Sequence, residues 1–177
     1  MPDLTTDRLL LRQWRDSDRE PFAALNADPA VMEHFPKLVS REDSDALVDR
    51  ASASIADHGW GLWAVEVRAT GEFIGFTGLS VPSFEAPFLP GVEIGWRLAK
   101  SAWGNGYATE AARAALAYGF GPVDLSEILS FTATTNIPSQ RVMQKIGMTR
   151  DEDGDFDHPR LPAGHRLQRH VLYRISR

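Results

Sequence analysis

The chain has 177 residues, 43% of them hydrophobic and 24% charged, a balance typical of one globular domain, and we expect a single domain over residues 1–177. The formal net charge of −5, without a run of basic residues, argues against a nucleic-acid partner and favours a neutral or cationic small substrate. The lack of cysteine excludes disulfides, thiolate metal ligands and a cysteine nucleophile.

The N-terminal residues Met1 to Arg8 show no cationic stretch followed by an apolar one, the pattern of a secretory leader. No apolar run approaches the length needed to cross a membrane. We therefore expect a cytoplasmic protein with no membrane partner. The pattern does not choose between a monomer and a homodimer.

The first half of the chain predicts a strand, two helices and a hairpin. Ser40 is a typical N-cap residue for the second helix, whose apolar residues recur at helical spacing until His58-Gly59 ends it. Gly75 and Gly78 in the second hairpin strand suggest a bulge or a close approach of other backbone. The expected elements are a strand over 8–14, helices over 16–27 and 40–58, and strands over 60–68 and 73–81.

The second half alternates strands with helices. Pro138 suits the first turn of the last helix, and Gly147 suits its C-terminal end. The polar segment 149–166, with its prolines and acids, predicts mostly loop. The expected elements are strands over 92–99, 127–134 and 167–175, a helix from the motif described next to about Gly119, and a helix over 136–146. This order predicts a mixed sheet with helices on its faces.

One motif, W-G-N-G-Y-A-T-E at residues 103–110, lies at a strand-to-helix joint. Glycines let a ligand approach the backbone closely, and a helix start offers unpaired N–H groups at the positive end of its dipole. These features predict an anion site, for which a phosphate group fits best. The motif lacks the third glycine of a dinucleotide fingerprint and the Gly-Lys-Ser/Thr of a P-loop, so the residues leave its ligand open, and a plain glycine turn is the alternative.

Three segments in order extend the pattern over nearly the whole chain: DRLLLRQW at 7–14, EIGWRLAKSAWGNGYATEA at 93–111 and TTNIPSQRVMQKIGM at 134–148. Together they resemble the GNAT superfamily of acyl-CoA-dependent N-acetyltransferases, in particular its branch of ribosomal-protein N-terminal acetyltransferases. Gly106 and Ala108 match the family's pyrophosphate loop, Gln/Arg-x-x-Gly-x-Gly/Ala. Trp103 replaces the first residue of that pattern, as is usual in this branch.

The resemblance implies an α/β (α+β) GNAT fold with a mixed, mostly antiparallel sheet of six to seven strands, splayed at the cofactor site and flanked by about four helices. It implies acetyl-CoA as co-substrate and no metal. The strand that ends at Leu98 is expected to part from its neighbour, so that the pantetheine arm pairs with it like an added strand. The residues expected at the cofactor are Trp96, Arg97, Leu98, Gly104, Asn105, Gly106, Tyr107, Ala108, Thr109, Asn136, Ser139 and Arg141.

The reaction implied is direct transfer of an acetyl group from the CoA thioester to an amine, either a small molecule or a peptide N-terminus. Glu93, a carboxylate in an otherwise apolar strand, is the candidate base; the alternatives are an ordinary partly exposed strand residue, or one that pairs with an arginine such as Arg97. Backbone N–H groups around Trp96 to Leu98 are candidate donors to the oxyanion. The family's usual acid is a tyrosine four residues before the glycine, where this chain has Met143, which leaves Ser139 or Tyr107 as substitutes.

Two other functions stay open: a CoA-binding module with weak or lost catalysis, suggested by Met143, and an acyltransferase with a different acyl chain or acceptor. The histidines 34, 158, 165 and 170 match no compact metal-ligand spacing. The acidic run between Asp151 and Asp157 either faces water or lines the acceptor pocket and attracts an amine. Phe35 is expected in the core or at the border of the acceptor site.

Overall fold

A computed structural model describes residues 3–177, so Met1 and Pro2 of the expected domain lie outside it. An eight-stranded sheet in the order β1-β2-β3-β4-β5-β6-β8-β7 forms its centre. The strands are β1 (Leu4–Thr5), β2 (Leu9–Arg12), β3 (Leu62–Val67), β4 (Glu72–Ser80), β5 (Glu93–Leu98), β6 (Glu127–Ala133), β7 (Thr149–Asp157) and β8 (Arg169–Ser176). The helices are α1 (Arg19–Asn26), α2 (Arg41–His58), α3 (Tyr107–Phe120) and α4 (Ile137–Lys145), with short 3₁₀ turns at Asp16–Asp18 and Lys100–Ala102.

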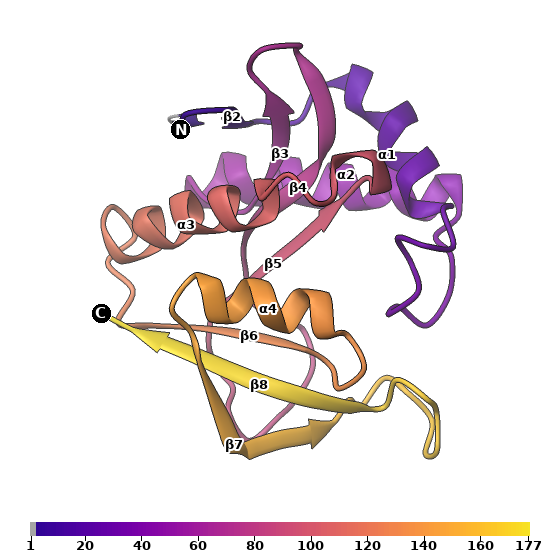
Figure 1. Ribbon diagram of the computed structural model, residues 1–177, viewed down its shortest axis with the longest axis vertical. Helices are drawn as coiled ribbons and strands as arrows, with labels where there is room; N and C mark the ends of the chain where they lie inside the picture. The colour runs from indigo at the N-terminus through magenta and orange to yellow at the C-terminus, as the bar shows by residue number, and fades with distance from the viewer. Residues whose placement is uncertain (1–2) are drawn as a thin grey trace.

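Helices cover both faces of the sheet. Figure 1 shows α3 and α4 in front of it and α2 behind it, and α1 packs on α2. Alanines give α3 a small buried stripe that lets the helix lie close to the strands. The core between these layers includes Trp63, Phe22 and Ile94, all almost fully buried.

The ends of α2 match the sequence prediction. The Ser40 hydroxyl accepts a hydrogen bond from the Asp43 backbone N–H at 3.0 Å, which satisfies one of the free amides at the helix start. Gly59 ends the helix in the left-handed conformation, with φ of 77°. These local signals place the helix correctly to within a residue.

The GNAT-type mixed sheet is confirmed, but the count of six to seven strands is too low, because β1 and β7 were not predicted as strands. Segment 149–157 reads as loop because of its acids, yet it forms the edge strand β7. Edge strands tolerate charged residues. Here Asp151 pairs with Arg174 at 2.7 Å, Asp155 with Arg150 at 2.6 Å, and Asp157 with Arg169 at 3.4 Å.

Candidate active site

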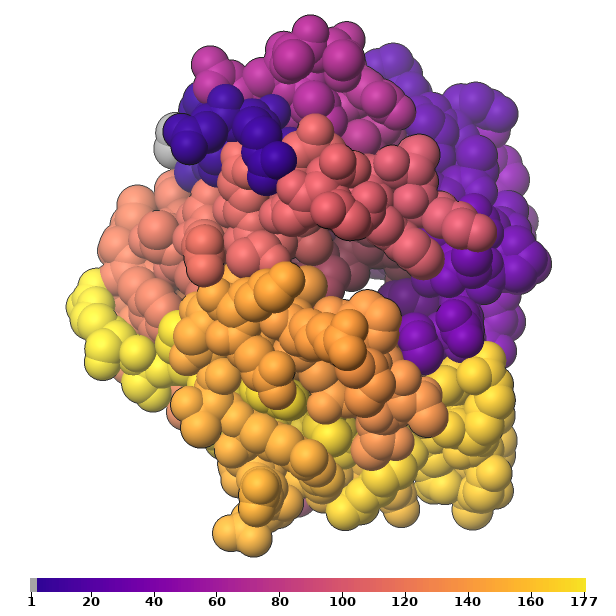
Figure 2. All heavy atoms as spheres, in the orientation of Figure 1, coloured from indigo at the N-terminus to yellow at the C-terminus, as the bar shows by residue number. Residues whose placement is uncertain are grey.

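The sheet opens between β5 and β6, its one pair of parallel neighbours. These strands are in register only at Glu93 and Leu129, whereas β4 and β5 stay paired from Glu93 to Leu98. Beyond that point the β5 edge has no strand beside it, as expected from the sequence. Figure 2 shows an opening through the molecule between the orange spheres of α4, the salmon spheres at the start of α3 and the purple segment between α1 and α2.

Alternation along β5 determines which backbone groups face this opening. The Ser130 hydroxyl donates to the Ile94 carbonyl at 3.0 Å, so Ile94 faces β6, while the Ala99 N–H donates to Ile74 of β4 at 2.8 Å. Because successive residues of a strand direct their backbone groups to opposite edges, Trp96 and Leu98 also face the opening. The backbone of Arg97 faces β4, so this residue offers the opening no N–H group.

Glu93 lies at the closed end of the opening, where β5 and β6 meet. Its carboxylate accepts a hydrogen bond from the Ser80 hydroxyl at 2.9 Å, and no salt bridge to it occurs within residues 3–177. Burial raises the pKa of Glu93 to about 7, against the opposing effect of the Ser80 hydrogen bond. The expected alternative, a pair with Arg97, does not form, because Arg97 bonds to Asn26 instead. Glu93 therefore changes its charge near neutral pH.

The glycine-rich loop, within the motif at residues 103–110, forms the mouth of the opening. It follows the C-terminal end of β5, away from Glu93. Gly104 and Gly106 have φ of 78° and 81°, which glycine adopts at no steric cost, and Gly106 is the N-cap of α3. Trp103 is 48% exposed, and its indole N–H donates to the Leu98 carbonyl at 3.0 Å. This bond ties the loop to the end of β5, and residues 104–109 are exposed or partly buried around the start of α3.

Arg8 holds this loop from the far end of the chain, which sequence reasoning missed. Its guanidinium donates to the Asn105 carbonyl at 2.9 Å, forms a salt bridge with Glu110 at 2.6 Å and lies 4.8 Å from the centre of the Tyr107 ring. Burial raises the pKa of Glu110, but hydrogen bonds from Thr6 and Arg8 outweigh it and the net pKa is lowered. A contact across 102 residues leaves no local pattern in the sequence.

A cleft of about 710 Å³ lies beside the loop and carries three basic side chains. They come from the turn between β1 and β2, from α3 and from the end of α4: Arg8, Arg113 and Lys145. Arg113 also donates to the Lys145 carbonyl at 2.8 Å, which joins α3 to α4. Arg141, expected here from the sequence, is exposed on α4 and does not line this cleft.

Asn136 and Ser139 lie at the start of α4, where Asn136 is the N-cap residue. The Asn136 amide donates to the Thr132 hydroxyl at 2.9 Å, and its oxygen accepts from the Ser139 backbone N–H at 3.3 Å. This cap leaves the Ser139 hydroxyl without a hydrogen bond to residues 3–177. Met143 is 1% exposed and belongs to the hydrophobic core.

An aromatic group borders the opposite side of the sheet's second half. The His158 and His170 rings lie 4.9 Å apart, and Phe84 lies 4.7 Å from His158. Burial is the first cause that lowers the pKa of His158 to about 4, with His170 and Arg160 adding to it, and burial also lowers the pKa of His170. Both rings are thus neutral at neutral pH. The other members of the group are Phe88, Phe131 and Phe156.

Three acids of β7, Asp151, Asp155 and Asp157, are each paired with an arginine, and the other two, Glu152 and Asp153, are exposed. Within residues 3–177 no three histidine, aspartate or glutamate side chains are grouped as metal ligands would be. In the same part of the chain, no helix is both long and apolar enough to cross a bilayer.

A mixed sheet that parts between two parallel strands, with a glycine-rich helix start at the mouth, defines the class of CoA-dependent acyltransferases. Residues 8–149 match the family described as acetyltransferase (GNAT) domain. The chain therefore belongs to the GNAT acetyltransferase family, and it is an acetyl-CoA-dependent N-acetyltransferase.

Relatives and solved structures agree with this assignment. YkkB of Bacillus subtilis (strain 168) is 37% identical over 146 residues, 82% of this chain and 84% of its own. The N-acetyltransferase YnaD of the same organism is 32% identical over 173 residues, 97% of this chain and 95% of its own. A GNAT-family acetyltransferase from Bacillus anthracis has a TM-score of 0.80 at 28% identity, covering 99% of this chain and 98% of the other.

The branch suggested by the sequence is also present among the solved structures. RimL, a ribosomal-protein alpha-N-acetyltransferase solved in complex with coenzyme A, has a TM-score of 0.77 over 99% of this chain and 98% of its own. At 18% identity this likeness concerns the fold.

Proposed function

We propose that this protein transfers the acetyl group of acetyl-CoA directly to a primary amine, with Glu93 as the general base. One observation carries the proposal: the free backbone edge of β5 runs from the glycine-rich loop to a partly buried carboxylate, Glu93, that has no cationic partner within residues 3–177. A base must lose its proton near the working pH, and a pKa of about 7 suits that task.

The residues present fit acetyl-CoA along this edge. Free N–H groups at the start of α3, from Gly104 to Thr109, suit the pyrophosphate, and the backbone of Trp96 and Leu98 suits the amide groups of the pantetheine arm. Asn136 and Ser139, at the start of α4, suit contacts to the pantetheine arm, and the basic cleft suits the nucleotide end. Arg97 and Arg141 are left out of this set, for the reasons of geometry given above.

The chemistry assigned to the protein has three parts. Acetyl-CoA, when bound, supplies an activated acyl group with a thiolate leaving group. Glu93 accepts the proton of the amine as the nitrogen–carbon bond forms, and N–H groups of β5 stabilise the negative charge that develops on the carbonyl oxygen. As the carbon–sulfur bond breaks, the Ser139 hydroxyl donates a hydrogen bond to the thiolate. No protein nucleophile is needed, in keeping with the absence of cysteine.

The test is release of free thiol from acetyl-CoA in the presence of a panel of amines, including amino acids, polyamines and peptides with free N-termini. We expect turnover with at least one class and acetylation of that amine by mass spectrometry. Acyl-CoAs of longer chain and a matched panel of alcohols, run in parallel, identify a different acyl group or acceptor.

The second candidate function is a CoA-binding module without catalysis. It is favoured by Met143, a buried apolar side chain at the position where the family usually has its acid. Tight CoA binding without thiol release on any amine of the panel would favour this module and reject the proposed reaction.

A further inference from the structure

Arg97 is a partly buried arginine whose only polar side-chain partner within residues 3–177 is neutral. Its Nη1 donates to the Asn26 amide oxygen at 2.7 Å, while Nε is buried and has no partner. The guanidinium carbon lies 4.1 Å from the centre of the Phe35 ring and 5.6 Å from that of Phe76. Burial lowers the pKa of Arg97 to about 10, so the side chain keeps its charge at neutral pH.

Arg12, which is buried, has a different set of partners. Arg12 is 3% exposed and bonds to both oxygens of Asp18, at 2.7 and 2.9 Å, and to Glu66 at 2.7 Å. A buried charge is costly unless it is paired, and two carboxylates meet that need for Arg12. No carboxylate of residues 3–177 forms a salt bridge with Arg97. A ligand that brings its own carboxylate would complete the Arg97 site as Asp18 completes that of Arg12.

Arg97 lies on the catalytic side of the sheet. The side chains of Arg97 and Glu93 point to the same face of β5, because their positions differ by four, an even number. Gly95 lies midway between them on that face. A Cβ added at Gly95 would meet nothing within 4 Å, so there is free space above this residue. Each of the two side chains starts about 7 Å from Gly95 along the strand, within reach of one small molecule seated there.

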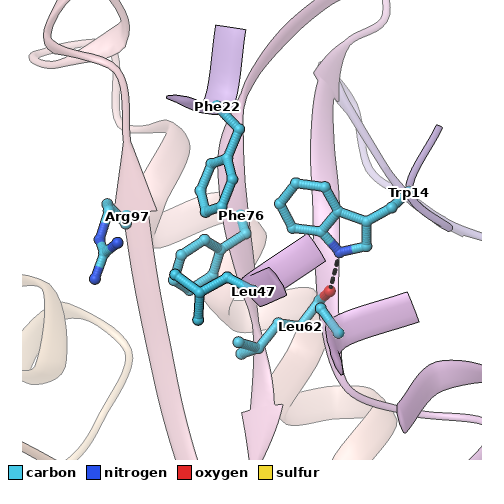
Figure 3. Close-up of a pocket in the computed structure, with 7 residues that line it drawn as sticks. Trp14, Phe22, Leu47, Leu62, Phe76 and Arg97 are labelled. Atoms are coloured by element: carbon cyan, nitrogen blue, oxygen red, sulfur yellow. Dashed lines mark hydrogen bonds between the residues drawn. The ribbon is translucent and has the colours of Figure 1, made fainter. Parts of the chain in front are cut away.

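The surroundings of Arg97 are otherwise apolar. Arg97 borders a cavity of about 40 Å³, which is also lined by Phe76, Phe22 and Leu47 (Figure 3). Asn26 is fully buried and held by Ser44 at 3.0 Å, which fixes the position of the guanidinium. Low solvent access strengthens a charge-assisted hydrogen bond, and the flat guanidinium matches the geometry of a carboxylate.

We propose that the amine acceptor also carries a carboxylate a few bonds from its nitrogen, as an amino acid does, and that Arg97 binds this carboxylate while Glu93 faces the amine. This inference rests on the proposed function, since it concerns the acceptor of that reaction. It replaces the cationic acceptor suggested by the net charge of −5, because Asp151, Asp155 and Asp157 of β7 are already paired and the Arg97 guanidinium has no carboxylate partner within residues 3–177.

The experiment measures kcat/KM with acetyl-CoA for α-, β- and γ-amino acids, each beside its own carboxamide. In the native protein the best carboxylate should exceed its carboxamide by about 10- to 100-fold, the value of one charged hydrogen-bonded contact. Arg97→Gln keeps an amide N–H for Asn26 and removes the charge, so the ratio should fall to about 1. Arg97→Lys, which keeps a cation without the planar fork, should retain part of the preference.

Each outcome decides a separate question. Carboxamides acetylated as fast as carboxylates in the native protein, or an unchanged ratio in Arg97→Gln, would overturn the inference and leave the proposed reaction standing. Absence of thiol release with every amine, while CoA still binds, would reject the reaction itself. If Arg97→Gln does not fold, the native ratio still decides the class of acceptor, and Arg97→Lys decides the role of the residue.

Discussion

The proposed chemistry depends on Glu93, a half-buried carboxylate at the closed end of the opening between β5 and β6. It has no cationic partner within residues 3–177. Glu93 is held by the Ser80 hydroxyl alone among residues 3–177, and burial makes its charged form expensive. This desolvation free energy destabilises the fold at a position close to the free edge of β5. Such a cost is typical of residues kept for a reaction.

The rate of acetyl transfer should follow the charge of Glu93. Because the base must be deprotonated, kcat/KM should rise as the pH increases through about 7 and level off above it. Glu93→Gln should lower kcat/KM by about 10²- to 10⁴-fold and abolish that rise. Steady-state kinetics over about two pH units on either side of the pKa of Glu93 measures both effects.

Stability provides the control for this variant. The raised pKa means that folded Glu93 keeps a proton where the unfolded chain has lost it, so this residue lowers the stability as the pH rises from the unfolded value to about 7. Glu93→Gln should therefore lose this part of the pH dependence and remain folded above pH 7. A rate profile unchanged in shape in a folded Glu93→Gln would remove Glu93 from the mechanism.

At the residue scale, the sequence indicates which side chains are candidates for catalysis better than it indicates which residues they contact. Glu93 stood out because it interrupts an apolar run, and the structure gives it the environment expected of such a residue. The link from Arg8 to Glu110 spans 102 residues, and that from Arg97 to Asn26 spans 71, so neither leaves a local pattern. The sequence alone therefore left a Glu93–Arg97 pair open as an alternative, and the fold shows Arg97 bonded to Asn26 instead.

At the element scale, glycines let strands approach closely where the sheet is built around the opening. Gly75 has φ of 132°, and a Cβ there would lie 2.1 Å from the Arg97 carbonyl oxygen. At Gly78 it would lie 2.0 Å from the Gly61 carbonyl oxygen. The sequence predicted a bulge or a close approach at both positions, and the β3–β4 register shifts opposite Gly75, between Val65 and Glu66.

Gly75→Ala should lower the free energy of unfolding by about 2–5 kcal/mol, since it adds a backbone clash to an unfavourable φ. The matched control is Gly71→Ala in the β3–β4 turn, where φ is 71° but a Cβ would meet nothing within 4 Å. That change should cost only about 1–2 kcal/mol. Urea unfolding of both variants measures the difference, and equal losses would contradict the close approach of β4 to β5.

Most elements could be placed from the sequence because their signals are local. Caps, such as Ser40 and Gly59 of α2, act within one turn of helix. β7 was missed because its pairing with β8, and the salt bridges of Asp157 to Arg169 and of Asp151 to Arg174, depend on residues 12 and 23 positions later in the sequence. The splay of β5 from β6 was expected only from the family resemblance, since no local pattern encodes where two parallel strands part.

At the scale of the whole molecule, the sheet consists of two halves joined at one register position between Glu93 and Leu129. Further links cross between the halves: Ser130 to the Ile94 carbonyl, Arg113 to the Lys145 carbonyl, and Arg166 to the Glu33 carbonyl at 2.7 Å. A ligand lying between the halves would contact both. Binding of CoA should therefore stabilise the protein against heat in proportion to the logarithm of its concentration.

The most direct measurement of the central claim is amide hydrogen exchange with and without CoA. The account predicts slower exchange on CoA binding at Trp96 and Leu98, whose N–H groups face the opening, and at residues 104–109 of the glycine-rich loop, with little change at Arg97, whose backbone already pairs with β4. Protection confined to other elements, with the β5 edge and the loop unchanged, would contradict it.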